Sequence, residues 1–169
     1  IDLQYQKFIK TLAFSDLWFS NFLNKKNRVV LSYNWKLRSL QSYIQQLEME
    51  SLGKRANPKS IFKETGQSIF GGFGSTAQHS YFQLLHQGTA EFCTDIIYST
   101  STSSPLSSAQ AQGQASLLSS DFKGSANLLE KTNSNSPVNL FHLNNLSLEA
   151  LGFLLATWEH RVFITASML

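Results

Sequence analysis

The sequence has 169 residues, of which 42% are hydrophobic and 15% are charged, and its formal net charge is +3. This length fits one domain with a buried core, and the hydrophobic content excludes a disordered chain. The basic residues are scattered apart from Lys25-Lys26-Asn27-Arg28 and Lys54-Arg55, so we expect no nucleic-acid partner. The charged fraction is below the roughly 25% of an average soluble domain, which indicates that further protein covers part of the surface.

Cysteine content and hydropathy limit the cellular location. Cys93 is the single cysteine, so no intrachain disulfide is possible and a reducing cytoplasm fits. No apolar run approaches the roughly 18 residues of a membrane helix, and no signal peptide precedes the first element. We therefore expect a cytoplasmic protein without a membrane partner. The chain begins at Ile1, inside an expected helix, which suggests a fragment of a longer protein.

The first half of the chain alternates between helical and extended patterns. Apolar residues at three- and four-residue steps predict a helix over 3–23 that is buried on much of its circumference. The β-branched run over 28–33 predicts a buried strand, and 35–52 is again helical and ends at Gly53. A very short strand is expected over 68–70.

The second half repeats this alternation, and a Ser/Thr-rich stretch over 99–108 predicts a mobile loop. Helices are expected over 77–87, over 109–131 and from Ser147 onward, and strands over 92–98 and 138–143. Strands that alternate with helices predict an α/β fold with a mostly parallel sheet. We therefore expect a three-layer α/β/α sandwich.

A glycine-rich loop over 71–77 lies between an expected strand and an expected helix. Its backbone N–H groups could bind an anion, and an ordinary strand-to-helix turn explains the same glycines equally well. His79 and His86 are seven residues apart and no cysteine lies near either, so we expect no metal site.

Two carboxylates lie near the end of the helix expected over 35–52. Glu48 and Glu50 are two residues apart, so their side chains face different sides of that helix. One is expected to point inward while the other is solvated. The alternative is that both are ordinary surface carboxylates.

Three segments together resemble the phosphoglucose isomerase family, over nearly the whole chain. They are Tyr43-Ile-Gln-Gln-Leu-Glu-Met-Glu-Ser-Leu-Gly-Lys54, Phe70-Gly-Gly-Phe-Gly-Ser-Thr-Ala-Gln-His-Ser-Tyr-Phe-Gln-Leu-Leu-His-Gln-Gly-Thr89 and Glu159-His-Arg-Val-Phe163. The resemblance implies a flavodoxin-like sugar-isomerase (SIS) domain over 1–169, the C-terminal one of a larger enzyme. It also implies an N-terminal SIS domain upstream of Ile1 and a lysine-bearing segment after Leu169.

The resemblance further implies an activity and its residues. Enzymes of this family interconvert glucose 6-phosphate and fructose 6-phosphate in glycolysis and gluconeogenesis, through a cis-enediol and without a metal or cofactor. By motif position, Glu50 corresponds to the base that moves the proton, a task that suits a carboxylate. His79 corresponds to the histidine that assists ring opening, supplied from the partner subunit of a homodimer, and Gln46 to a glutamine of the sugar site.

Some family positions differ in this chain. The asparagine expected after Met-Glu-Ser is Leu52, and Ser75-Thr76 replaces a Thr-Asn pair. An Asn-Arg-Pro-Ser stretch is not recognisable over 133–137. Two alternatives therefore stay open, a non-catalytic module that binds sugar phosphate and a dimerisation fragment. The resemblance also implies that 1–169 alone is inactive, because the arginine, the lysine and the phosphate loop of the family lie outside it.

Overall fold

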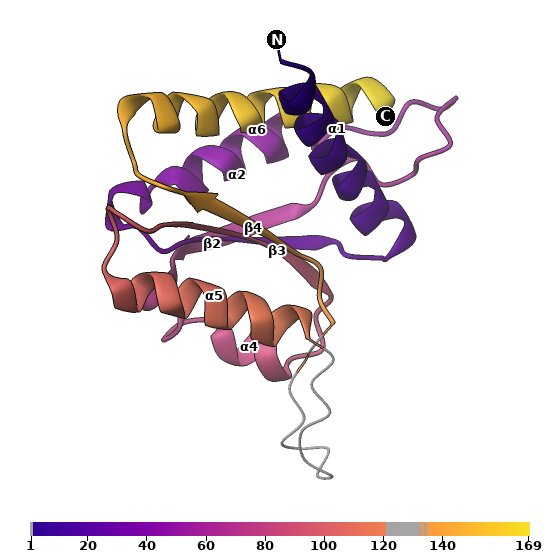
Figure 1. Cartoon of the computed structure of the whole chain (residues 1–169). Coiled ribbons are helices and arrows are strands. Elements are labelled where there is room, and N and C mark those ends of the chain that lie inside the picture. Colours follow the sequence, from indigo (N-terminus) through magenta and orange to yellow (C-terminus); the bar gives the residue numbers. More distant parts are fainter. Residues whose placement is uncertain (1, 121–132, 134) are drawn as a thin grey trace.

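A computed structural model describes residues 2–120, 133 and 135–169 as an α/β domain (Figure 1). Its sheet has four strands in the order β2-β1-β3-β4, and every neighbouring pair is parallel. The strands are β1 (Asn27–Ser32), β2 (Ser68–Phe73), β3 (Phe92–Ser99) and β4 (Val138–Leu143). The α/β class and the parallel sheet predicted from the sequence are confirmed.

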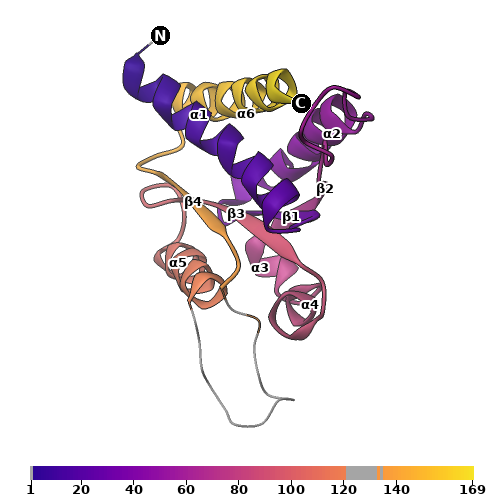
Figure 2. The same cartoon turned by 90° about the vertical axis from the view of Figure 1, so that its right-hand side faces the viewer.

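Helices cover both faces of this sheet, as the two views in Figures 1 and 2 show. One face carries α1 (Leu3–Leu17), α2 (Leu40–Leu52) and α6 (Leu148–Met168). The other carries α3 (Gly74–Ala77), α4 (Phe82–Gln87) and α5 (Pro105–Ser119). The predicted three-layer arrangement is thereby confirmed. Within the described part of the chain, no helix has both the length and the apolar character needed to span a membrane.

Each face of the sheet has its own apolar core. Successive side chains of a strand point to opposite faces, so Val30 belongs to one core while Val29 and Leu31 belong to the other. Every residue of β3 is buried, as expected for a central parallel strand covered on both sides. The continuous apolar runs in the sequence therefore correspond to strands that have no solvent-facing side.

The first helix differs from its sequence-based prediction. It ends at Leu17 and continues as a π-helical turn over Trp18–Phe22. Leu3 is 65% exposed and Leu23 is 40% exposed, so the prediction of burial on much of the circumference is wrong. The buried residues lie on one side of α1, because only that side packs against the rest of the domain.

The glycine-rich segment also begins differently. Gly71 is part of β2 rather than of a loop, with φ at +154°, and a Cβ there would lie 1.9 Å from the carbonyl oxygen of Val30. The expected helix over 77–87 is divided into α3 and α4 by a turn. Since α3 has four residues, it offers no helix N-terminus of the kind that binds anions.

Helix α5 begins inside the stretch over 99–108 that was expected to be a mobile loop. Ser104 caps it, because the Ser104 hydroxyl accepts a hydrogen bond of 3.1 Å from the Ser107 backbone N–H, and Pro105 occupies the first turn. The described helix ends at Ser119, and the remainder of the helix expected over 109–131 falls mostly outside the described residues.

Candidate functional site

Glu50 and Gln46 lie together on the exposed side of α2. The Gln46 side-chain amide is 3.4 Å from Glu50 Oε2 and donates to it. Residues four apart are neighbours on a helix surface, so this pairing follows directly from the spacing. Two of the three predicted site residues are therefore brought together.

His79 lies elsewhere, in the turn between α3 and α4. Helix α2 packs on the Val30 face of the sheet, whereas α4 packs on the face that contains Val29 and Leu31. His79 and Glu50 therefore belong to different layers of one chain. The structure does not place them in a common site within a single copy.

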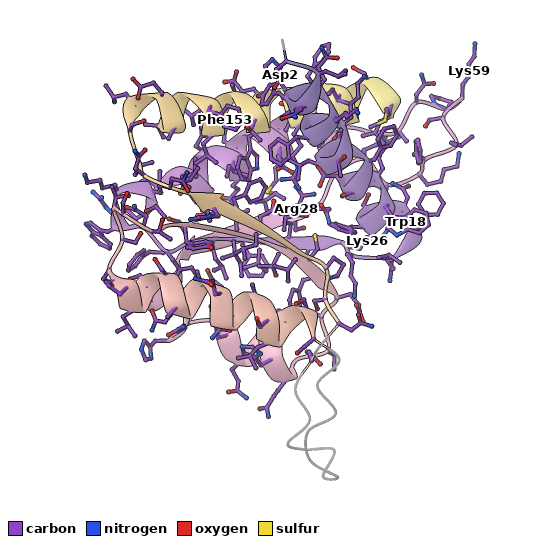
Figure 3. The ribbon with its side chains drawn as sticks, viewed as in Figure 1. Asp2, Trp18, Lys26, Arg28, Lys59 and Phe153 are labelled. Carbon is purple, nitrogen blue, oxygen red and sulfur yellow. The ribbon has the colours of Figure 1, made fainter. Side chains whose placement is uncertain are left out.

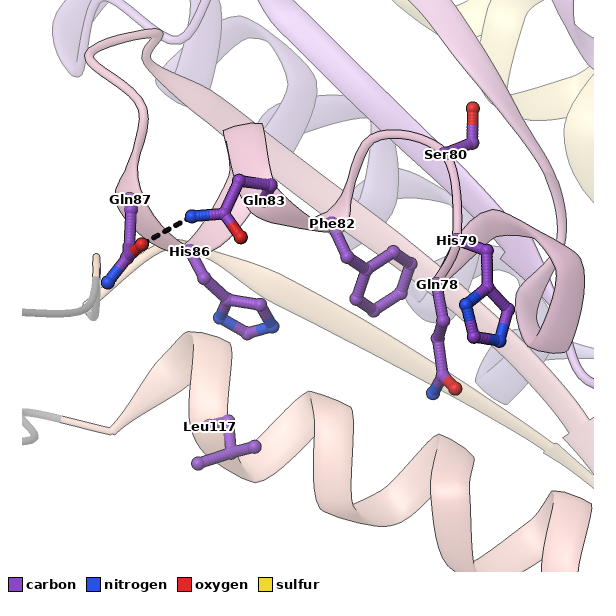
Figure 4. A pocket seen from close by; sticks show the side chains of 8 residues that line it. All are labelled: Gln78, His79, Ser80, Phe82, Gln83, His86, Gln87 and Leu117. Atoms are coloured by element: carbon purple, nitrogen blue, oxygen red, sulfur yellow. Dashed lines mark hydrogen bonds between the residues drawn. The ribbon is translucent and has the colours of Figure 1, made fainter.

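A cavity of about 530 Å³ adjoins His79 between α4 and α5. Figure 4 shows His79 and His86 in its wall with Phe82 between them, and Leu117 facing them from α5. The cavity is lined by Gln78, His79, Ser80, Phe82, Gln83, His86, Gln87 and Leu117. His86 Nε2 is 3.1 Å from Gln114 Oε1, so this second histidine is tied to α5. The cavity therefore offers both hydrogen-bonding side chains and the apolar Phe82 and Leu117 to a ligand.

The predicted motif differences have definite places in the structure. Leu52 is 6% exposed and points into the interior, away from the exposed surface that carries Glu50. The Ser75 hydroxyl donates to Gln110 Oε1 at 3.3 Å, which links α3 to α5. In this fold, Leu52 is a core residue rather than a lining residue of the Glu50 surface.

Two arginines and three carboxylates form a buried charged cluster beneath α1, α2 and α6. Arg28, on β1, donates to Asp16 and lies 3.1 Å from both carboxylate oxygens of Glu48. Arg161, on α6, donates to Asp16 at 2.6 and 2.7 Å and to Asp95 at 2.8 Å. Figure 3 shows Arg28 in the interior between the sheet and the helices above it. We call these five residues the charged cluster.

The charged cluster contains one more carboxylate than guanidinium groups. Burial raises the pKa of Glu48, and the nearby Arg28 and Arg161 offset this only in part. Burial acts on Asp95 too, but Arg161 and Arg28 outweigh it and hold the pKa of Asp95 below its ordinary value. A proton on Glu48 therefore brings the cluster closer to neutrality, which lowers the cost of burying it.

Sequence reasoning missed this cluster apart from Glu48. The prediction that one of Glu48 and Glu50 points inward is confirmed, since Glu48 is 4% exposed and Glu50 is exposed. A pattern could have revealed the others: Asp16 is in phase with the buried side of α1, and Arg161 follows the buried Trp158 by three residues. A charge in phase with an apolar face predicts a buried ion pair. No group of three or more His, Cys, Asp or Glu among the described residues could hold a metal ion.

Comparisons with known proteins agree on one family. The model of the phosphoglucose isomerase family matches residues 5–169. Glucose-6-phosphate isomerase of Shewanella sp. strain ANA-3 is 35% identical over 178 residues, which cover 90% of this chain and 33% of the relative. The enzyme of Shewanella amazonensis is 36% identical, with 88% and 32% covered. This chain therefore spans about a third of the length of the curated relatives it matches.

Solved structures give the same result. A glucose-6-phosphate isomerase from Chlamydia trachomatis superimposes with a TM-score of 0.78 and 28% identity, over 91% of this chain and 32% of that one. A hypothetical protein from Thermus thermophilus has a TM-score of 0.70 at 18% identity, over 91% of this chain and 39% of its own. The second likeness supports the fold alone.

Proposed function

Because this chain belongs to the phosphoglucose isomerase family, we propose that it is the C-terminal sugar-isomerase domain of a longer glucose-6-phosphate isomerase. The observation that carries the proposal is the exposed Glu50–Gln46 pair within a family motif. The substrate is then a sugar phosphate, and no cofactor takes part. A buried single cysteine, Cys93, fits the cytoplasmic location that we propose with it.

Glu50 is the proposed base. Its carboxylate removes the proton from C2 of the open-chain aldose while O1 takes up a proton, which gives a cis-enediol. The carboxylate then returns its proton to C1 while O2 loses its own, which gives the ketose. The hydrogen bond from Gln46 to Oε2 restrains the carboxylate and leaves Oε1 for the substrate. A positioned carboxylate of this kind contributes about 10²- to 10⁴-fold to the rate.

We propose that His79 acts in the site of a partner subunit of a homodimer. Its place in the layer opposite α2 supports this, because Glu50 and His79 then meet only across two copies. An imidazole near neutral pH can exchange the protons that ring opening needs. A symmetric dimer would contain two equivalent sites, each with Glu50 of one subunit and His79 of the other.

The first experiment is a coupled assay of fructose 6-phosphate conversion on the full-length protein and on 1–169. We expect activity in the full-length protein only. Glu50→Gln should reduce its kcat by about 10²- to 10⁴-fold, while the free energy of unfolding stays within about 0.5 kcal/mol because the side chain is exposed. Glu149→Gln, which alters an exposed carboxylate on α6, is the matched control and should leave kcat unchanged. Sugar-phosphate binding without turnover by the wild-type protein would contradict the proposal and support a regulatory binding module.

A mixing experiment tests the dimer. Full-length Glu50→Gln and His79→Ala proteins should each be nearly inactive. Exchange of equal amounts makes about half of the dimers mixed, each with one of its two sites intact, so about a quarter of wild-type activity should return. If both residues acted within one subunit, mixing would restore nothing.

A further inference from the structure

The last turns of α2 carry two carboxylates with opposite surroundings. Glu48 is 4% exposed and contacts Arg28, whereas Glu50 faces solvent. With about 3.6 residues per turn, positions two apart lie on nearly opposite sides of the helix. If the contact of the inward side chain shifts this part of the helix, the outward side chain moves with it.

Arg28 is a fixed point in the interior. It lies on β1 with 1% exposure, and its Nη2 donates to Asp16 and to Gln67. Its other terminal nitrogen, Nη1, is 3.1 Å from both oxygens of Glu48. Since Asp16 on α1 and Gln67 just before β2 hold the guanidinium, the length of the Glu48 side chain defines how far α2 stands from β1.

The strand next to β1 holds the same part of α2. The Gln45 side-chain amide donates to the carbonyl oxygen of Ile69 at 2.6 Å. The Ile69 backbone N–H lies 3.5 Å from the Met49 sulfur, a weak acceptor. These contacts align α2 along β2. The Glu48 contact with Arg28 fixes the distance between α2 and the sheet at the part of α2 that carries Glu50.

We propose that Glu48 is a positioning residue whose contact with Arg28 sets the place of the Glu50 carboxylate. This inference rests on the proposed function, because the place of Glu50 affects turnover only if Glu50 is the base. A base must lie within hydrogen-bond reach of the proton that it removes. A misplacement of about 1 Å costs on the order of 10²-fold in rate.

The inference makes side-chain length, rather than charge, the property that counts. Glu48→Gln keeps the length and one oxygen that can accept from Arg28. Glu48→Asp keeps the charge and removes one methylene, so α2 must move toward β1 or the contact must break. A role limited to charge balance in the cluster would leave Glu48→Asp like the wild type, because that variant keeps the carboxylate.

The test measures kcat and KM of both variants in the full-length protein. We expect Glu48→Asp to lower kcat by about 10- to 100-fold with KM within about twofold of the wild-type value. Glu48→Gln should rescue kcat to within about threefold of wild type. Equal kcat values for the two variants, or a lower value for Glu48→Gln, would overturn the inference.

Asp95→Asn is the control for loss of stability. It removes a carboxylate from the same cluster, but on β3, a strand that carries no proposed site residue. We expect a lower Tm with kcat unchanged, and a fall in kcat equal to that of Glu48→Asp would overturn the inference. If Glu48→Asp does not fold, Glu48→Gln decides: native circular dichroism with retained kcat supports the inference, and a loss of more than about tenfold overturns it.

Glu50→Gln separates this inference from the proposed function. If Glu50→Gln remains active, the assignment of the base fails and the positioning role fails with it. If Glu50→Gln is inactive while Glu48→Asp turns over like wild type, only the positioning role is wrong.

Discussion

The two faces of the sheet are stabilised in different ways. On the face covered by α1, α2 and α6, the charged cluster joins residues far apart in sequence, with Arg161 and Asp16 separated by 145 positions. On the opposite face, the turn that carries His79 follows β2 after only the four residues of α3, and the fit of α3 depends on Gly74 against the ring of Tyr33. Burial raises the pKa of Tyr33 to about 12, so its hydroxyl adds no charge to this face.

This difference bears on the two proposed site residues. The place of Glu50 depends on α2, which is held by partners from other elements of the chain, so it is set only when the whole face has assembled. The place of His79 depends on a short segment next to one strand. Substitutions in the two faces should therefore differ in how much they destabilise the protein and in how far from the changed residue the effect extends.

Arg161→Met should have the largest effect on stability. It removes a guanidinium that is fully buried and leaves Asp16 and Asp95 without one of their partners. Breaking a buried ion pair from one side costs about 3–5 kcal/mol. Urea unfolding followed by circular dichroism measures the loss.

The matched control for Arg161→Met is Arg38→Met. Arg38 is exposed, and its guanidinium lies 4.7 Å from the Trp35 ring centroid. Its loss should cost less than about 1 kcal/mol. Equal losses for the two variants would show that the charged cluster does not hold its face of the sheet together.

Gly74→Ala tests the other face and should have a moderate effect. A Cβ at this position would lie 2.4 Å from the Tyr33 ring, so the ring or the turn must move. Overpacking of this kind costs about 1–3 kcal/mol. Gly113→Ala on α5 is the control: nothing lies within 4 Å of its Cβ, and the change should stabilise the protein by about 0.5–1 kcal/mol. Thermal unfolding measures both variants, and a Gly74→Ala protein as stable as the wild type would contradict the expectation.

The sequence predicts the order of elements well, because apolar periodicity is a local property. Strands over 28–33 and 92–98 are buried strands in the structure, within a residue at their ends. The start of α5 was missed because a run of serines looks the same as a loop or as a cap, and only the Ser104 hydrogen bond distinguishes them. Element boundaries depend on such single contacts.

The site was predictable to a different extent. The spacing of Gln46 and Glu50 implies their pairing on a helix, and the inward and outward directions of Glu48 and Glu50 follow from the same geometry. The partner of Glu48 was not predictable, because Arg28 reaches it from β1, and Arg28 is itself held by Asp16 of α1, which only the folded sheet brings near. The catalytic roles of Glu50 and His79 stay predictions.

The smallest expected effect distinguishes two carboxylates within the charged cluster by their pH dependence. Asp95 has a lowered pKa, so its contribution to stability is present above the ordinary value of about 3.8 and is lost as the pH falls through the lowered pKa. Glu48 has a raised pKa, so its contribution is present below about 4.5 and is lost as the pH rises through the raised pKa. The two contributions therefore have opposite signs.

Urea unfolding between acid and neutral pH measures both. The stability of the wild-type protein relative to Asp95→Asn should shrink as the pH falls below the ordinary pKa of aspartate. Its stability relative to Glu48→Gln should shrink as the pH rises, because glutamine resembles the protonated carboxyl that burial favours. Each change should be about 1.4 kcal/mol for each unit by which the pKa differs from its ordinary value. Parallel curves for the two variants would mean that Glu48 does not hold the proton that offsets the excess negative charge of the cluster.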